Sequence, residues 1–167
     1  MKINIEIKAI CRNTEQVRGI LLSKGARFIG TDKQEDTYFN VNEGRLKLRV
    51  GNIENNLIFY KRTNQAGPKQ SDFKLVKVED AAGLKEILTA AFGVLKVVYK
   101  SREIYFIENV KFHLDFLAEL GNFVEIEASN LLVDKTVEEL RSQCEYYSGV
   151  LSILPADLLT DSYSDMR

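Results

Sequence analysis

The chain has 167 residues, of which 45% are hydrophobic and 28% are charged, as in a globular protein with one sizeable core. We therefore expect residues 1–167 to form a single domain. The 23 basic and 24 acidic residues leave a net charge of −1, which argues against binding to nucleic acid or to an anionic membrane, so any anion site must be local. The chain has no apolar signal core, and its two cysteines, Cys11 and Cys144, lack metal-ligand spacing. We expect reduced thiols and a cytoplasmic protein.

Residues 3–12 alternate almost without interruption between apolar and polar side chains, which predicts a strand with one apolar face. A helix should follow, beginning at Asn13 or Thr14 and ending near Gly25. The next stretch favours extended structure with a few turns. We expect extended segments over residues 26–29, 34–40, 45–50, 57–62 and 71–78, and a flexible loop over residues 64–70.

A second helix is predicted from Asp80 to Gly93 because its leucine and isoleucine residues share one helical face. Three strands should follow, over residues 95–107, 110–117 and 123–129. Thr136 and Glu139 match a capping box at the start of a third helix, and the tail over residues 155–167 is short and polar, with room for a helical stretch. Strands joined by hairpins, with three helices, predict an α+β fold with a largely antiparallel sheet.

Several of these strands have charged side chains at alternate positions, so that the charges share one face of the strand. The residues concerned are Glu6 with Lys8, Arg45 with Lys47 and Arg49, Lys100 with Arg102, His113 with Asp115, and Glu125 with Glu127. On a single strand this pattern is the ordinary solvent face of an antiparallel sheet. Here the helices need the apolar face of the sheet, and a strongly twisted sheet tends to close, so the charged face would line a polar tunnel. Its basic rows would hold a polyanion, and its carboxylates would hold a divalent cation.

On these residues the sequence resembles the CYTH superfamily and, within it, the class IV adenylyl cyclases. The resemblance is carried by Asn4-Ile5-Glu6-Ile7-Lys8, by Lys100-Ser101-Arg102, by Asp115 at a strand end, and by Gly121 to Ile126. It implies a closed eight-stranded antiparallel β-barrel with flanking helices. This barrel would be a tunnel that binds ATP, tripolyphosphate or thiamine triphosphate with Mg²⁺ or Mn²⁺. A homodimer is also expected. Asn4 departs from the family pattern, which has Glu at this position.

The resemblance and the chemistry of the side chains together suggest roles. Phosphate oxygens would be bound by Lys8, Lys47, Arg49, Lys61, Lys100 and Arg102. The metal would be held by Glu6, Asp115, Glu125 and Glu127, for which ion pairing is the alternative. The residues expected to be catalytic are Glu6, Lys8, Asp115 and Glu125. Rim or solvent positions are expected for Arg45, Arg62, Lys69 and Lys74. We expect His113 to be a structural partner of a carboxylate rather than a general base, and Tyr38, Tyr60 and Tyr105 to be packing residues rather than a platform for a base.

Two reactions fit such a tunnel. In a cyclase the ribose 3′-hydroxyl attacks the α-phosphate and pyrophosphate leaves, whereas in a triphosphatase water attacks the terminal phosphate. The resemblance favours a class IV adenylyl cyclase that converts ATP to cyclic AMP and pyrophosphate. A triphosphatase is the alternative, and a third hypothesis is a triphosphate-binding protein without activity, marked by Asn4.

Overall fold

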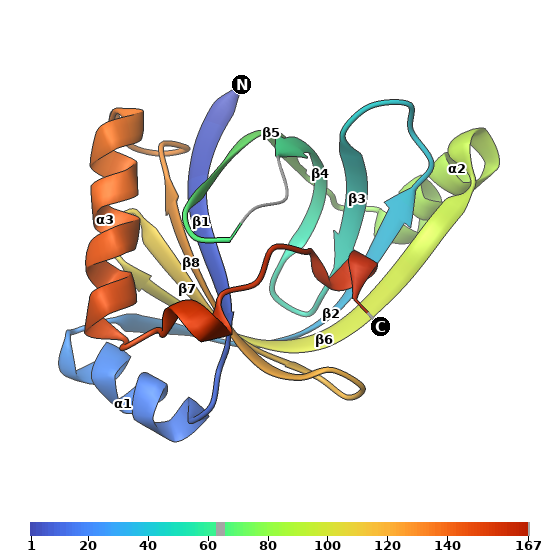
Figure 1. Ribbon diagram of the computed structural model, residues 1–167. Helices are drawn as coiled ribbons and strands as arrows, with labels where there is room; N and C mark the ends of the chain where they lie inside the picture. The colour runs from blue at the N-terminus through green and yellow to red at the C-terminus, as the bar shows by residue number, and fades with distance from the viewer. Residues whose placement is uncertain (63–65, 167) are drawn as a thin grey trace.

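The structure, a computed structural model, describes residues 1–62 and 66–166 and contains a closed antiparallel β-barrel (Figure 1). The strands are β1 (Lys2–Ile10), β2 (Arg27–Phe39), β3 (Arg45–Val50), β4 (Asn55–Arg62), β5 (Lys69–Lys77), β6 (Val94–Ile107), β7 (Val110–Leu117) and β8 (Gly121–Ser129). The helices are α1 (Thr14–Ser23), α2 (Ala81–Phe92) and α3 (Val137–Val150), and two short 3-10 turns follow at Pro155–Asp157 and Tyr163–Asp165. The predicted eight-stranded barrel with flanking helices is confirmed.

The barrel closes because β1 pairs with both β5 and β8, in the order β1-β5-β4-β3-β2-β6-β7-β8. Most predicted strand boundaries shift by one or two residues, and two regions differ in a way that matters for the fold. The extended segments expected over residues 26–29 and 34–40 belong to one long strand, β2, which bends at a register shift between Phe28 and Gly30. Strand β5 already begins at Lys69, inside the predicted loop over residues 64–70, and residues 64 and 65 of that loop lie outside the described residues.

The predicted helix starts are confirmed by side-chain caps. Asn13 accepts a hydrogen bond from the backbone N–H of Gln16, Asp80 from that of Gly83, and Thr136 from that of Glu139. Each cap satisfies a donor that the first helical turn would otherwise leave without a partner. Among the described residues, no helix has the length and apolar character needed to cross a membrane.

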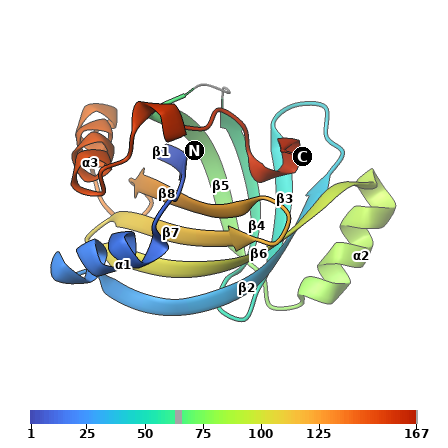
Figure 2. The ribbon, with the colours of Figure 1, turned by 60° about the horizontal axis from the view of Figure 1, so that its bottom comes forward.

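The helices pack on the outside of the barrel, on the apolar faces of the strands (Figure 2). Helices α1 and α3 lie over the part of the barrel that contains β1, β7 and β8, where Ile7, Phe112, Ile126 and Leu140 form the main core. Helix α2 lies on the other side, with Leu88 against Phe39 and Leu48. Both cysteines are buried and free. Because the apolar faces point outward to the helices, the polar faces of the strands point into the barrel.

Candidate active site

The interior of the barrel is a cavity of about 610 Å³, and half of the residues that line it are charged. The register of the strand pairs places charged residues of neighbouring strands side by side. Glu6 lies opposite Glu127, Lys8 opposite Glu125, and Glu125 opposite His113. Ten lysine or arginine and six acidic side chains line this cavity among the described residues. The cavity therefore combines an excess of positive charge with a separate group of carboxylates.

The largest group of cations gathers around Asp36, a residue with 1% exposure that we did not predict. Arg49 donates two hydrogen bonds of 2.9 Å to its carboxylate, Lys100 forms an ion pair with it, and Lys47 Nζ lies 3.8 Å away. Burial by itself raises the pKa of Asp36, but the three cations hold it well below its usual value. Asp36 shares its parity with Gln34 and Tyr38, so the alternation of β2 could have identified it.

A second ion pair joins Arg102 to Asp115 through two hydrogen bonds of 2.7 and 2.8 Å. The hydroxyl of Tyr163 donates a further bond of 2.7 Å to Asp115, and the ring of Tyr163 lies 3.7 Å below Lys8 Nζ. Lys8 Nζ is also 3.8 Å from Glu125. Asp115 thus has its oxygens occupied by protein donors, and its predicted role as a metal ligand stays a prediction that these contacts do not favour.

The carboxylates Glu6, Glu125 and Glu127 form an acidic group on β1 and β8, beside Asn4 and His113. Ligand atoms of His113, Glu125 and Glu127 lie within 4.8 Å of one another. Burial and the charge of Glu125 raise the pKa of Glu127 to about 8. Burial and the charge of Arg102 lower the pKa of His113 well below its usual value, which keeps the ring neutral. Cations reach two of these carboxylates, since Arg62 forms an ion pair with Glu6 and Lys8 Nζ lies 3.8 Å from Glu125.

Three atoms in this group have no hydrogen-bond partner among the described residues. Asn4 is buried, and its amide nitrogen donates to Glu6 at 3.2 Å, while its oxygen Oδ1 has no donor. Neither ring nitrogen of His113 has a partner either. Buried polar atoms without partners are uncommon, and these face carboxylates that repel one another. Closely spaced carboxylate oxygens, beside an amide oxygen that has no donor, fit a hard cation such as Mg²⁺ or Mn²⁺.

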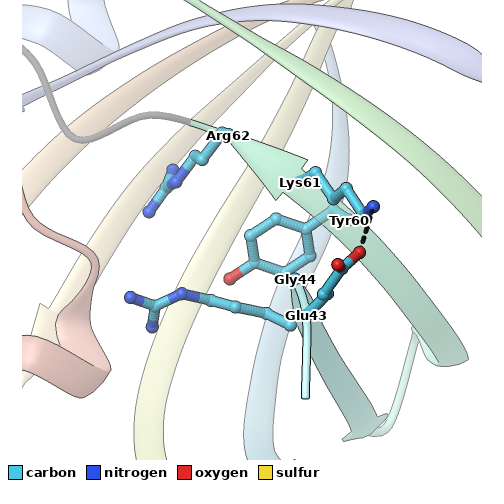
Figure 3. Close-up of a pocket in the computed structure, with 6 residues that line it drawn as sticks. Glu43, Gly44, Tyr60, Lys61 and Arg62 are labelled. Atoms are coloured by element: carbon cyan, nitrogen blue, oxygen red, sulfur yellow. Dashed lines mark hydrogen bonds and ion pairs between the residues drawn. The ribbon is translucent and has the colours of Figure 1, made fainter. Parts of the chain in front are cut away.

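The expectation that Lys61 lies in the tunnel is wrong. Figure 3 shows Lys61 and Arg62 projecting to opposite sides of β4, and Lys61 reaches Glu43 on the outside with a side chain that is 50% exposed. Arg62, expected at the rim, is instead a tunnel residue whose side chain is 7% exposed and paired with Glu6. Side chains alternate along a strand, so Ile58, Tyr60 and Arg62 share the inner face and Lys61 cannot.

Of the other residues expected at the rim or in packing positions, some lie where they were predicted and some do not. Lys69 is fully buried, against expectation, and its ammonium donates to the carbonyl of Thr160 at 2.9 Å. Arg45 binds the C-terminal segment, and Lys74 is exposed as expected. Tyr38 and Tyr60 line the tunnel, whereas Tyr105 packs in the outer core. The tunnel brings the remaining predicted residues together: Glu6, Lys8, Lys47, Arg49, Lys100, Arg102, Glu125 and Glu127.

Comparisons with known proteins agree with this architecture. The family model described as the CYTH domain matches residues 2–147. A protein of Methanocaldococcus jannaschii named "putative adenylate cyclase" is 27% identical over 174 residues, covering 99% of this chain and 98% of the relative. A solved structure from Pyrococcus horikoshii has a TM-score of 0.83 at 25% identity and covers 99% of both chains. Another, called a "putative adenylate cyclase" from Vibrio parahaemolyticus, has a TM-score of 0.79 at 17% identity, with 97% of this chain and 95% of that one covered.

Proposed function

Because this chain belongs to the CYTH domain family, we propose that it binds ATP with a divalent metal ion in its tunnel and converts the ATP to cyclic AMP and pyrophosphate. The observation that carries the proposal is the excess of buried cations next to an acidic group in one cavity. A triphosphate carries several negative charges, and a bound divalent cation would share them with the protein. A cavity of this size also suits a small organic ligand rather than a macromolecule.

The phosphates would be held by the cations that now surround Asp36 and Asp115. Arginine offers a planar pair of donors to phosphate oxygens, and lysine offers a compact point charge. Arg49 and Arg102 suit the first role, and Lys8, Lys47 and Lys100 suit the second. These side chains are already fixed by ion pairs with buried carboxylates, so binding would cost little reorganisation.

The metal would be held by Glu6, Glu125 and Glu127, with Asn4 Oδ1 as an uncharged ligand. When bound, Mg²⁺ or Mn²⁺ would neutralise charge on the phosphate oxygens and on the leaving pyrophosphate. Asn4 supplies an oxygen without a charge, so the protein alone should bind the metal weakly, and the phosphate should complete the site. His113, neutral and buried beside Glu125, would orient that carboxylate.

A patch of apolar side chains in the tunnel favours a substrate with an organic group. Ile58 and Tyr60 on β4 lie directly opposite Leu75 and Phe73 on β5, and all four line the cavity. A nucleoside can pack against such a surface, whereas an inorganic polyphosphate cannot. Hydrolysis of a triphosphate such as thiamine triphosphate or tripolyphosphate is the alternative, since the same cations and metal ligands would serve attack by water. The third hypothesis is that the protein binds a triphosphate without turnover. It is based on Asn4, which offers the metal an oxygen without a charge.

The products distinguish these hypotheses. Purified protein is incubated with Mn²⁺ and either ATP, tripolyphosphate or thiamine triphosphate, and cyclic AMP, pyrophosphate and orthophosphate are measured separately. We expect cyclic AMP and pyrophosphate in equal amounts from ATP. Orthophosphate without cyclic AMP would identify a triphosphatase, and tight ATP binding without any product would identify a binding protein. The variant Lys100→Ala with Arg102→Ala should lose turnover and controls for contaminating enzymes.

A further inference from the structure

The last part of the chain runs across one end of the barrel (Figures 1 and 2). We call residues 158–166 the C-terminal strap. Leu158 bridges to Ala9, and the backbone N–H of Leu159 donates to the carbonyl of Lys8 at 2.9 Å. Farther along, the guanidinium of Arg45 donates to three side chains of the strap, at 3.0 Å to Ser162, 2.8 Å to Ser164 and 2.6 Å to Asp165. The strap is thus tied to β1 and to β3.

Two residues of the strap, Ser162 and Tyr163, line the cavity, and the larger is Tyr163. Tyr163 is 5% exposed, its ring packs on Phe123 with centroids 5.2 Å apart, and its hydroxyl reaches Asp115. The same ring lies under Lys8 Nζ, at 3.7 Å. Tyr163 therefore contacts side chains that we assign to the phosphate site, and it fills the space into which a longer phosphate chain would extend.

Tyr60 and Arg62 complete the wall at this end. They separate the tunnel from a shallow outer pocket of about 430 Å³, which Figure 3 shows beside Lys61 and Glu43. Arg62 is held in place by its ion pair with Glu6. Among the residues that the structure describes, Tyr163, Tyr60 and Arg62 thus close this end of the tunnel.

The opposite end is open. There the lining includes side chains that reach solvent, among them Leu132 with 91% exposure and Leu131 with 38%. Lys77, at the end of β5, and Glu108, after β6, are exposed on the same rim. The apolar patch of Phe73 and Leu75 leads from this rim into the cavity. The two ends of the tunnel therefore differ, since one is sealed by buried side chains and the other is an accessible mouth.

We propose that the C-terminal strap makes the tunnel a blind pocket that accepts only a phosphate chain with a free terminal phosphate. The terminal phosphate would lie towards Tyr163, and the organic group would stay at the open mouth. The interior of an eight-stranded barrel is narrow, so a ligand with organic groups on both ends of its phosphate chain could not place the second group beyond the closed end. This inference rests on the proposed triphosphate function and adds an orientation and a substrate class to it.

A pair of ligands tests the proposal on the unmodified protein. ATP has one free terminal phosphate, whereas diadenosine tetraphosphate has adenosine at both ends and a similar charge. By calorimetry, we expect diadenosine tetraphosphate to bind at least about a hundredfold more weakly than ATP. Comparable affinities would overturn the blind pocket while leaving triphosphate binding intact. If neither ATP nor tripolyphosphate binds, the proposed function itself fails, and this inference fails with it.

Variants test whether the strap is responsible. Arg45→Ala removes all three bonds to Ser162, Ser164 and Asp165, so diadenosine tetraphosphate should gain at least about tenfold in affinity and ATP should change little. The matched control is Arg18→Ala, which breaks an ion pair with Glu103 on the outside of the barrel and should change neither affinity. Tyr163→Ala, which shortens the side chain that fills the closed end, provides a second test, with folding checked by circular dichroism. Continued exclusion of diadenosine tetraphosphate by folded Arg45→Ala and Tyr163→Ala would overturn the role of the strap.

Discussion

Lys61 and Arg62 are adjacent cations on β4 with opposite surroundings. Lys61 faces solvent, and Arg62 faces the tunnel beside Glu6. We predict that Arg62→Ala weakens the binding of tripolyphosphate by about tenfold or more, because it removes a buried cation from the lining of the tunnel. Lys61→Ala should change the affinity by less than about twofold, because an exposed ion pair contributes little. Calorimetry measures the tripolyphosphate affinity of both variants. Equal losses of affinity would contradict the assignment of Arg62 to the inside of the tunnel and of Lys61 to the outside.

Asn4 occupies the position at which the resemblance to the CYTH superfamily leads us to expect Glu. Asn4→Glu would place a carboxylate next to Glu6, where Asn4 now donates a hydrogen bond. Without metal the added charge should lower the melting temperature, because it would repel the other buried carboxylates. With Mn²⁺ the same charge should strengthen metal binding, since the divalent ion interacts strongly with each ligand charge in a partly dry site.

The measurement is a Mn²⁺ titration of the wild type and of Asn4→Glu, with and without tripolyphosphate. For the wild type, we expect tight metal binding only with tripolyphosphate present. Asn4→Gln, which changes the length but not the charge, is the control and should not gain metal affinity. Tight Mn²⁺ binding by the wild type alone, or a loss of affinity in Asn4→Glu, would place the metal elsewhere.

At the scale of elements, helix α3 stabilises the barrel from outside without contributing to the tunnel. Leu140 on α3 is fully buried in the main core. Leu140→Ala should lower the free energy of unfolding by about 2–5 kcal/mol, through lost burial and the cavity left behind. Leu95→Ala, at a position 65% exposed on β6, should change it by less than about 0.5 kcal/mol. Urea unfolding measures both, and the tripolyphosphate affinity of the folded Leu140→Ala protein should stay near that of the wild type.

At the scale of the whole molecule, closure of the barrel lowers the pKa of several tunnel lysines. Burial lowers the pKa of Lys100 to about 8, although Asp36 opposes the shift, and burial with the charge of Arg49 lowers the pKa of Lys47 well below its usual value. Arg49 and Arg102 stay charged. Positive charge is therefore lost from the tunnel as the pH rises through about 8, well below the ordinary lysine value.

We thus predict that the affinity for tripolyphosphate falls by about tenfold or more between about pH 7 and 9.5. Tripolyphosphate can only become more negative over this range, so a fall must come from the protein. Calorimetry across the range measures the effect. The variant Lys100→Arg keeps its charge and should bind with a smaller loss of affinity at high pH. An affinity that rises with pH would contradict the assignment of lysines to the phosphate site.

The sequence by itself determined the extended segments, although it divided β2 in two, and it determined the three helices with their caps and the charged faces of β1, β3, β6 and β8. These features follow from local rules, because alternation of side chains and capping both act within a few residues. Where the local pattern is ambiguous the prediction failed. In β4 both parities are apolar before they reach a cation, with Ile58 and Tyr60 on one side and Leu57 and Phe59 on the other, so nothing local indicates that Arg62 rather than Lys61 faces inward.

Only the tertiary structure decided which charges meet and where the tunnel ends. Asp36 and Arg49 are opposite one another because β2 and β3 pair in one register, and Arg102 meets Asp115 through the pairing of β6 with β7. Lys69 is buried because the strap passes over it, and Tyr163 reaches Asp115 from a tail that has no periodic pattern. These contacts join residues far apart in the chain, so they depend on closure of the barrel and on the path of the strap, which local sequence patterns do not encode.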